Sequence, residues 1–62
     1  MKVVIRHNSE IVAKTNLPVI PTVGNNIRLR NGQEFEIVKI TFVESQDTSE
    51  IDYVGYLELE VK

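Results

Sequence analysis

The stretch Val23–Phe42, VGNNIRLRNGQEFEIVKITF, decides the fold. It contains two runs in which apolar and polar residues alternate, a period typical of strands with one buried face. The alternation slips by one residue between Ile37 and Val38. A β-bulge produces such a slip and also bends the strand. The stretch therefore predicts a β-hairpin whose second strand bends, the unit from which small barrels are built.

The turn of this hairpin is predicted at Asn31-Gly32, a strong hairpin signal. A two-residue loop would place Leu29 opposite Glu34, which is out of phase. A type I turn followed by Gly32 in the left-handed conformation restores the phase. It sets Arg28 opposite Glu34, so the arginine is expected to have a partner within the hairpin.

Residues 1–17 contain two further alternating runs rich in β-branched side chains, which predict a second hairpin. Opposed residues share a face, so the apolar sets of the two strands must meet. A three-residue loop achieves this by setting Ile5 opposite Ile11. The same register makes Arg6 and Glu10 an exposed cross-strand pair.

The connection LPVIPTVGNN, residues 17–26, is predicted to be a crossing loop. Pro18 and Pro21 cannot donate ladder hydrogen bonds, and both restrict the residue before them. The favoured interpretation is that the apolar residues of this loop cap one end of the core. The alternative is a surface patch formed by Val19 and Ile20 around the prolines.

After a polar, acidic loop, apolar residues recur at alternate positions over residues 51–61 without a slip. This pattern predicts the last strand. Pairing Phe42 with Ile51 would bring Gly55 opposite Val38. A glycine there would suit a bent neighbouring strand, because it has no side chain to accommodate.

Length and composition exclude several classes of function. The chain has 62 residues, which allows one domain, and it has no Cys and one His. Disulfides and Cys-ligated zinc are excluded, and no metal, cofactor or catalytic residue is predicted. His7 falls in a predicted turn, without the cleft and buried carboxylate that a triad needs. No apolar run is long enough for a membrane span or a signal peptide, so a complete, free-standing cytoplasmic protein is expected.

Charge is distributed unevenly along the chain. Residues 1–33 carry five Lys or Arg against one Glu, whereas residues 34–62 carry eight acidic residues against two Lys. Basic residues beside Tyr53 or Tyr56 would suit single-stranded nucleic acid. The candidates for that surface are Lys2, Lys14, Arg28 and Arg30. The favoured alternative is that the basic and acidic strands pair and neutralise each other.

Five apolar residues fall in the solvent-facing phase of their predicted strands and are the candidate protein-interaction patch. They are Val4, Val12, Val43, Val54 and Tyr56. If they are adjacent they form an interface, and if they are scattered singly they need no explanation.

The pattern V-G-N-N-I-R-L-x-N-G-x-x-F-x-I, Val23 to Ile37, resembles the V-G-D-x-V-x-V…G-x-x-G-x-V pattern of SH3-like small barrels. Asn25 stands where those barrels usually have Asp, and the aromatic pair that lines the peptide groove of SH3 domains is missing. The resemblance implies an architecture and no particular function.

We therefore predict an all-β protein, a single five-stranded SH3-like or related small barrel over residues 1–62, built from consecutive antiparallel hairpins. The expected core is Val3, Ile5, Ile11, Ala13, Leu17, Ile27, Leu29, Phe35, Ile37, Ile40, Phe42, Tyr53, Leu57 and Leu59. The expected function is a non-enzymatic interaction module that binds a protein partner or self-associates as a homo-oligomer. Its size suits an accessory protein of a phage or mobile element. The alternative function is single-stranded nucleic-acid binding through the basic N-terminal half.

Overall fold

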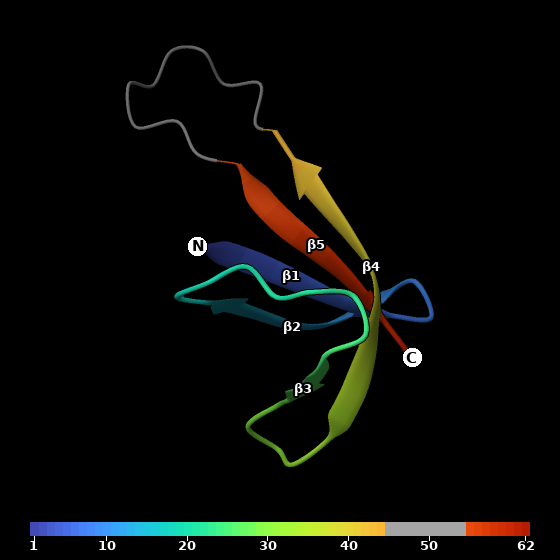
Figure 1. Ribbon diagram of the computed structural model, residues 1–62. Helices are drawn as coiled ribbons and strands as arrows, with labels where there is room; N and C mark the ends of the chain where they lie inside the picture. Colours follow the sequence, from blue (N-terminus) through green and yellow to red (C-terminus); the bar gives the residue numbers. More distant parts are fainter. Residues whose placement is uncertain (45–54) are drawn as a thin grey trace.

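The computed structural model describes residues 1–44 and 55–62, and their regular structure is entirely β-strand. The five strands are β1 (Lys2–His7), β2 (Glu10–Asn16), β3 (Asn26–Arg28), β4 (Glu34–Val43) and β5 (Tyr56–Val61). They form one sheet in the order β2-β1-β5-β4-β3. The sheet curls into a half-barrel with β2 and β3 at its two edges (Figure 1). The predicted all-β, five-stranded, barrel-like fold is confirmed.

The centre of the sheet is a parallel pair, β1 beside β5, which the sequence did not indicate. Val3 lies opposite Leu57 and Ile5 lies opposite Leu59. The other pairings, β1–β2, β3–β4 and β4–β5, are antiparallel. The fold is therefore a mixed sheet, in which the two ends of the chain lie side by side and supply the central strands.

The core lies on the concave face of this sheet and comes mainly from β1 and β5. Its fully buried residues are Val3, Ile5, Ile37, Leu57, Leu59 and Val61. Partly buried residues packed against them are Ala13, Leu17, Ile27, Leu29, Phe35 and Ile40. All of these except Val61 were predicted. The placements of Ile11 and Phe42 in the core were wrong, because these side chains are 47% and 59% exposed. The predicted core residue Tyr53 lies outside the described residues.

The first hairpin is tighter than predicted. Its turn contains two residues, Asn8 and Ser9, with φ angles of 54° and 70°. Positive φ at both central residues is the property of a type I′ turn, whose twist matches that of paired strands. His7 consequently lies opposite Glu10. The predicted three-residue loop is wrong.

A β-bulge then restores the apolar phase that the short turn would have broken. Ile5 lies opposite Ala13 and Arg6 lies opposite Ile11, so Val12 is the additional residue on β2. The predicted pairings are wrong because the two-residue turn already sets Arg6 opposite Ile11 instead of Glu10, and the bulge then sets Ile5 opposite Ala13 instead of Ile11. The short turn sets Ile11 opposite Arg6 on the outer face, which explains the exposure of Ile11.

The second hairpin has the predicted geometry. Arg28 lies opposite Glu34, and Gly32 has a φ of 91°. The N–H of Gly32 donates to the carbonyl oxygen of Leu29 (3.0 Å), and the N–H of Leu29 donates to that of Gln33 (2.7 Å). These bonds close a β-turn followed by a residue in the left-handed region, as the Asn31-Gly32 signal predicted.

The bend in β4 is also where it was predicted. The register with β5 shifts between Ile37 and Lys39, which makes Val38 the bulged residue. The crossing loop attaches to β4 just before this point. The N–H of Gly24 donates to the carbonyl of Ile37, and the N–H of Ile37 donates to that of Asn25, both at 2.9 Å.

The register predicted between the last two strands was wrong. Phe42 lies opposite Leu57 instead of Ile51, and Gly55 lies beside Val43 and Phe42, away from Val38. Sliding a strand by an even number of residues keeps every side chain on its face, so alternation cannot select among such registers. Ile51 itself lies outside the described residues.

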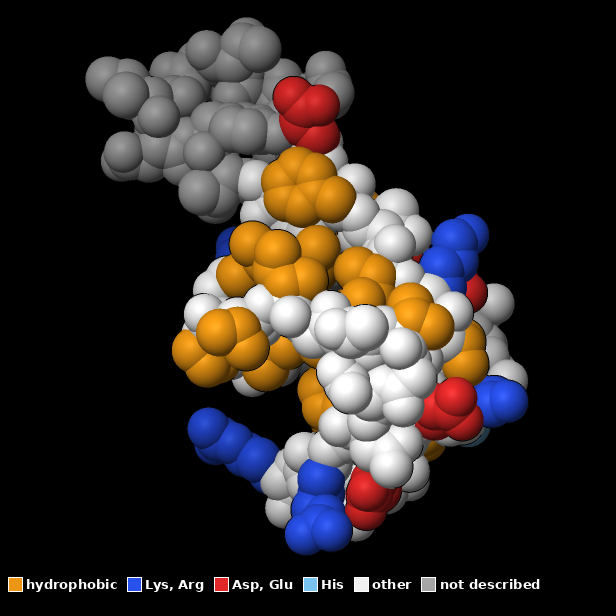
Figure 2. Space-filling model, in the orientation of Figure 1, with side chains coloured by type: hydrophobic (Ala, Val, Ile, Leu, Met, Phe, Trp, Pro, Cys, Tyr) orange, Lys and Arg blue, Asp and Glu red, His pale blue; other side chains and the backbone are white. Residues whose placement is uncertain are grey.

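The crossing loop covers less of the core than expected. Leu17 is half-buried, and hydrogen bonds of 2.8 Å join its N–H and its carbonyl to the main chain of Met1. Val19 and Ile20 are exposed, so the favoured capping interpretation is wrong for them. Hydrophobic side chains on the visible face gather over this region and the upper part of the half-barrel (Figure 2).

Candidate interaction groove

The half-barrel is open along one side, and a groove of about 680 Å³ runs along this opening. Its lining comes from β2 and the loop after it, and from β3 and the turn after it, with Ile5 of β1 beneath. β2 and β3 are the two edges of the described sheet. We call this groove the seam. A notch in the surface separates the lower hairpin, which carries Lys or Arg side chains, from the main body (Figure 2).

The floor of the seam is apolar because apolar residues of both edge strands, of the segments that follow them and of β1 line it. These residues are Ile5, Val12, Ala13, Leu17, Ile27 and Leu29. Ala13, Leu17, Ile27 and Leu29 remain only partly buried although they pack against the core. In a closed barrel a further strand would cover such residues. The seam thus leaves a flank of the core exposed to solvent.

The rim of the seam is basic. Lys14 on one side and Arg28 and Arg30 on the other line it, and no acidic side chain does so in the part of the chain that the structure describes. Arg28 has an ion pair with Glu34 (3.3 Å), but both side chains are largely exposed, so water screens it. Neither Lys14 nor Arg30 has an ion pair within residues 1–44 and 55–62. The predicted partner of Arg28 within the hairpin is therefore confirmed, whereas Arg30 has no ion pair among the described residues.

The candidate nucleic-acid residues divide between two surfaces. Arg28 and Arg30 line the seam, whereas Lys2 lines a separate groove of about 510 Å³ on the outer face of β1 and β2. Lys14 borders both grooves. The structure therefore does not assemble the four residues into one surface. Tyr56 lies in the outer groove with Lys2, whereas Tyr53 is outside the described residues.

The candidate protein-interaction patch is only partly contiguous. Val4 and Tyr56 line the outer groove, and Val43 lies opposite Tyr56 on β4. Val12 lies at the β2 bulge and lines the seam. Val54 lies outside the described residues. The part of the patch that the structure describes is thus an outer row of three residues and one residue in a different groove.

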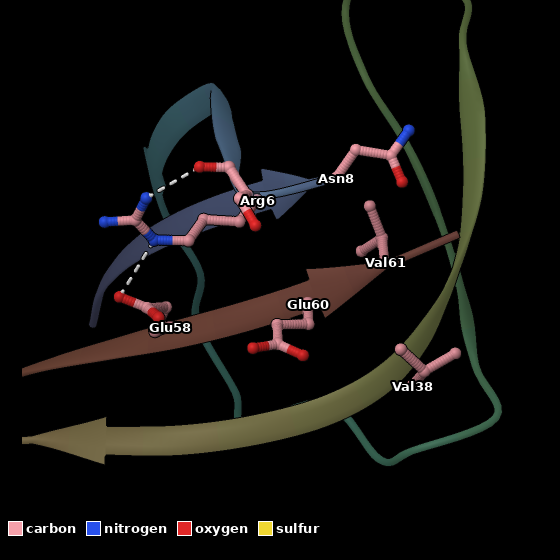
Figure 3. A pocket seen from close by; sticks show the side chains of 7 residues that line it. Arg6, Asn8, Val38, Glu58, Glu60 and Val61 are labelled. Atoms are coloured by element: carbon pink, nitrogen blue, oxygen red, sulfur yellow. Dashed lines mark hydrogen bonds and ion pairs between the residues drawn. The ribbon is translucent and has the colours of Figure 1, made fainter.

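A third hollow, of about 460 Å³, lies near the β1–β2 turn (Figure 3). Its charged residues are Arg6, Glu58 and Glu60. The Nε of Arg6 lies 3.1 Å from Oε2 of Glu58, and its Nη1 donates to the Ser9 carbonyl at 3.2 Å. Since these contacts occupy the guanidinium within the protein, the hollow presents less unmatched charge than the seam. We therefore take the seam as the candidate site.

The described residues contain no cluster of three or more His, Cys, Asp or Glu side chains suited to a metal ion. They also contain no helix long and apolar enough to span a membrane. No protein-family model, curated protein or solved structure matches the chain. What can be inferred about function therefore comes from the geometry of the half-barrel and its grooves.

Sequence reasoning did not find the seam. It identified Ile27 and Leu29 as core residues, which they are in part, and Arg28 and Arg30 as a basic pair. Alternation shows which face of a strand is apolar, but it does not show which strands end as edges. The open side of the barrel follows from the strand order, which has no local signal.

Proposed function

We propose that this chain is a non-enzymatic interaction module that binds a protein partner in the seam between β2 and β3. The observation that carries the proposal is the apolar floor lying open between two edge strands. Edge strands present unpaired N–H and C=O groups that can pair with another chain. An apolar groove flanked by such edges can thus contribute both hydrophobic burial and main-chain hydrogen bonds.

The size of the core supports the same proposal. A chain of 62 residues buries only about 60% of its unfolded surface, and six apolar side chains are buried among the residues that the structure describes. Covering the apolar floor would add about 25 cal/mol of stabilising free energy for each Å² of apolar surface removed from water. A partner seated in the seam would therefore stabilise the fold as well as bind it.

Single-stranded nucleic acid is the second candidate, and the outer groove favours it. Lys2, Lys14 and Tyr56 line that groove, and a basic surface with an aromatic platform suits stacked bases. Phosphate contacts make affinity fall steeply with salt. A titration of oligothymidylate at increasing salt tests this candidate, and absence of binding at low salt would exclude it.

The finer parts of the proposal concern the relationship to SH3-like barrels, self-association and cellular role. The hairpin formed by residues 26–43, with its left-handed Gly32, supports a relationship to SH3-like barrels. The exposed Val19, Ile20 and Phe42 support self-association as an alternative mode of binding. Light scattering over a dilution series tests self-association, and a mass that stays monomeric at high concentration would exclude it. A cytoplasmic accessory role in a phage or mobile element is proposed from size and composition alone.

Two matched variants test the seam itself. Val12 and Val38 are both bulge residues, and each is 39% exposed, but only Val12 lines the seam. Val12→Gln and Val38→Gln should therefore have similar effects on stability, which thermal melts can verify. In pull-downs from the producing cell, the Val12 variant should lose a protein that the wild type and the Val38 variant both retain. If no captured protein distinguishes the two variants, the seam is not the binding site.

A further inference from the structure

We propose that the occupant of the seam is an extended segment of another protein, with alternating apolar and acidic side chains, which adds as a strand between β2 and β3. This inference rests on the proposed function and specifies the chemistry of the partner. It follows from three properties of the seam: its edges, its two-sided polarity and the sign of its charge.

The edges determine the conformation of the occupant. β2 spans Glu10–Asn16 and β3 spans Asn26–Arg28, and each has a neighbour on one side only within the described sheet. A segment that bonds to either edge must be extended, because strand addition pairs main-chain groups along the ladder. One that bonds to both would convert the half-barrel into a six-stranded closed barrel (Figure 1). Closure removes both exposed edges.

The two faces of the seam determine why apolar and acidic side chains should alternate along the occupant. Successive side chains of a strand point to opposite faces. The inward side chains of the occupant would meet the apolar floor at Ala13, Ile27 and Leu29. The outward side chains would lie beside Lys14 and Arg28, which occupy the solvent-facing positions of the two edges. Apolar residues suit the first set, and acidic residues suit the second as cross-strand partners.

The sign of the charge discriminates among classes of occupant. The rim is basic, and Arg30 has no ion pair in the described part of the chain. Nucleic acid would match the rim, but the floor offers no aromatic side chain for base stacking among the residues that line the seam. Bases would then cover aliphatic side chains without the stacking that normally supplies their affinity.

A second copy of the chain is also a poor match. The described strands with alternating acidic residues are β4, which carries Glu34 and Glu36, and β5, which carries Glu58 and Glu60. Each already has a neighbouring strand on both sides, so neither can enter a seam without unfolding its own sheet. Neither of the acidic strands that the structure describes is therefore available as the occupant, and the proposal assigns this role to another protein.

The test uses the full chain and a labelled, blocked peptide of about six residues, the usual length of a strand, in which Val alternates with Glu. Binding is followed by fluorescence anisotropy, and the site by backbone amide shifts in NMR spectra. Three further probes serve as controls: a peptide with Lys in place of Glu, a peptide of the same composition with its Val and Glu residues in separate blocks, and oligothymidylate.

The expected result is that the alternating acidic peptide binds most tightly and shifts amides of both β2 and β3. Arg30→Glu should lower the affinity for the acidic peptide about fivefold and raise the affinity for the Lys peptide by a similar factor, since one exposed charge contact is reversed. Arg30 is exposed, so this variant should fold normally.

Other outcomes would overturn the inference. Equal binding of the block peptide would exclude strand addition, and tighter binding of oligothymidylate at the seam would identify a nucleic-acid site. Failure of every peptide would overturn the acidic-strand occupant. If the pull-down still depends on Val12 in that case, the seam remains an interaction site for a partner of different chemistry. If the pull-down also fails, the proposed function fails with it.

Discussion

The Nε atom of Arg6 lies 3.1 Å from Oε2 of Glu58, and this ion pair joins the two parallel strands at the centre of the sheet (Figure 3). The same guanidinium donates through Nη1 to the carbonyl of Ser9, in the turn that follows β1. One side chain therefore connects the β1–β2 turn, β1 and β5. Sequence reasoning paired Arg6 with Glu10, and this pairing does not form because the two-residue turn sets Glu10 opposite His7.

We expect Arg6→Gln to lower the free energy of unfolding by about 1 kcal/mol, measured by urea denaturation. The side chains of Arg6 and Glu58 are only 33% and 22% exposed, whereas those of Arg28 and Glu34 are 73% and 46% exposed. The matched control Arg28→Gln should therefore change stability by no more than about 0.5 kcal/mol. Equal effects of the two substitutions would show that the Arg6 contacts have no special structural role.

Replacement of Ser9 with glycine is expected to stabilise the protein. Ser9 has a φ of 70°, a left-handed conformation that costs an L-residue about 1 kcal/mol and costs glycine almost nothing. Asn-Gly is also the preferred sequence of a type I′ turn. Ser9→Gly should thus raise the free energy of unfolding by about 1 kcal/mol, as measured by urea denaturation.

Ser9→Ala is the control for this turn, because it removes the hydroxyl and retains the strain of a side chain at positive φ. It should leave the urea midpoint nearly unchanged. If Ser9→Ala raised stability as much as Ser9→Gly, the effect would come from loss of the hydroxyl and not from relief of the backbone conformation.

Gly55 is expected to tolerate no side chain. A Cβ at this position would collide with the carbonyl oxygen of Val43 and would lie 2.8 Å from Cζ of Phe42. The first obstacle is backbone, which cannot move without disturbing the β4–β5 pairing. Gly55→Ala should therefore lower the free energy of unfolding by about 1–3 kcal/mol, the usual cost of overpacking.

A double substitution separates the two obstacles. Phe42 is 59% exposed, so Phe42→Ala alone should cost little. In the double variant, Phe42→Ala should restore only part of the free energy of unfolding that Gly55→Ala removes, because the Val43 carbonyl remains in place. Full recovery in the double variant would show that the ring was the only obstacle.

Local reasoning succeeded where neighbouring residues carry the signal. The Asn31-Gly32 turn, the opposition of Arg28 to Glu34 and the bulge at Val38 were all predicted, and each involves residues close in sequence. It failed at the first turn because Asn8 and Ser9 adopt positive φ without a glycine to indicate it. The short turn altered the pairings of His7 and Arg6, and the compensating bulge at Val12 altered every pairing farther from the turn.

The sequence by itself determined the fold class and which face of each strand is apolar, because alternation is a property of successive side chains. Only the tertiary structure decided that β1 and β5 are neighbours, since they come from opposite ends of the chain and their parallel pairing has no local signal. That pairing leaves β2 and β3 as edges, and the edges create the seam. The stretch Val23–Phe42 thus contains its own hairpin geometry, whereas the function proposed for its basic residues depends on a strand order set by long-range packing.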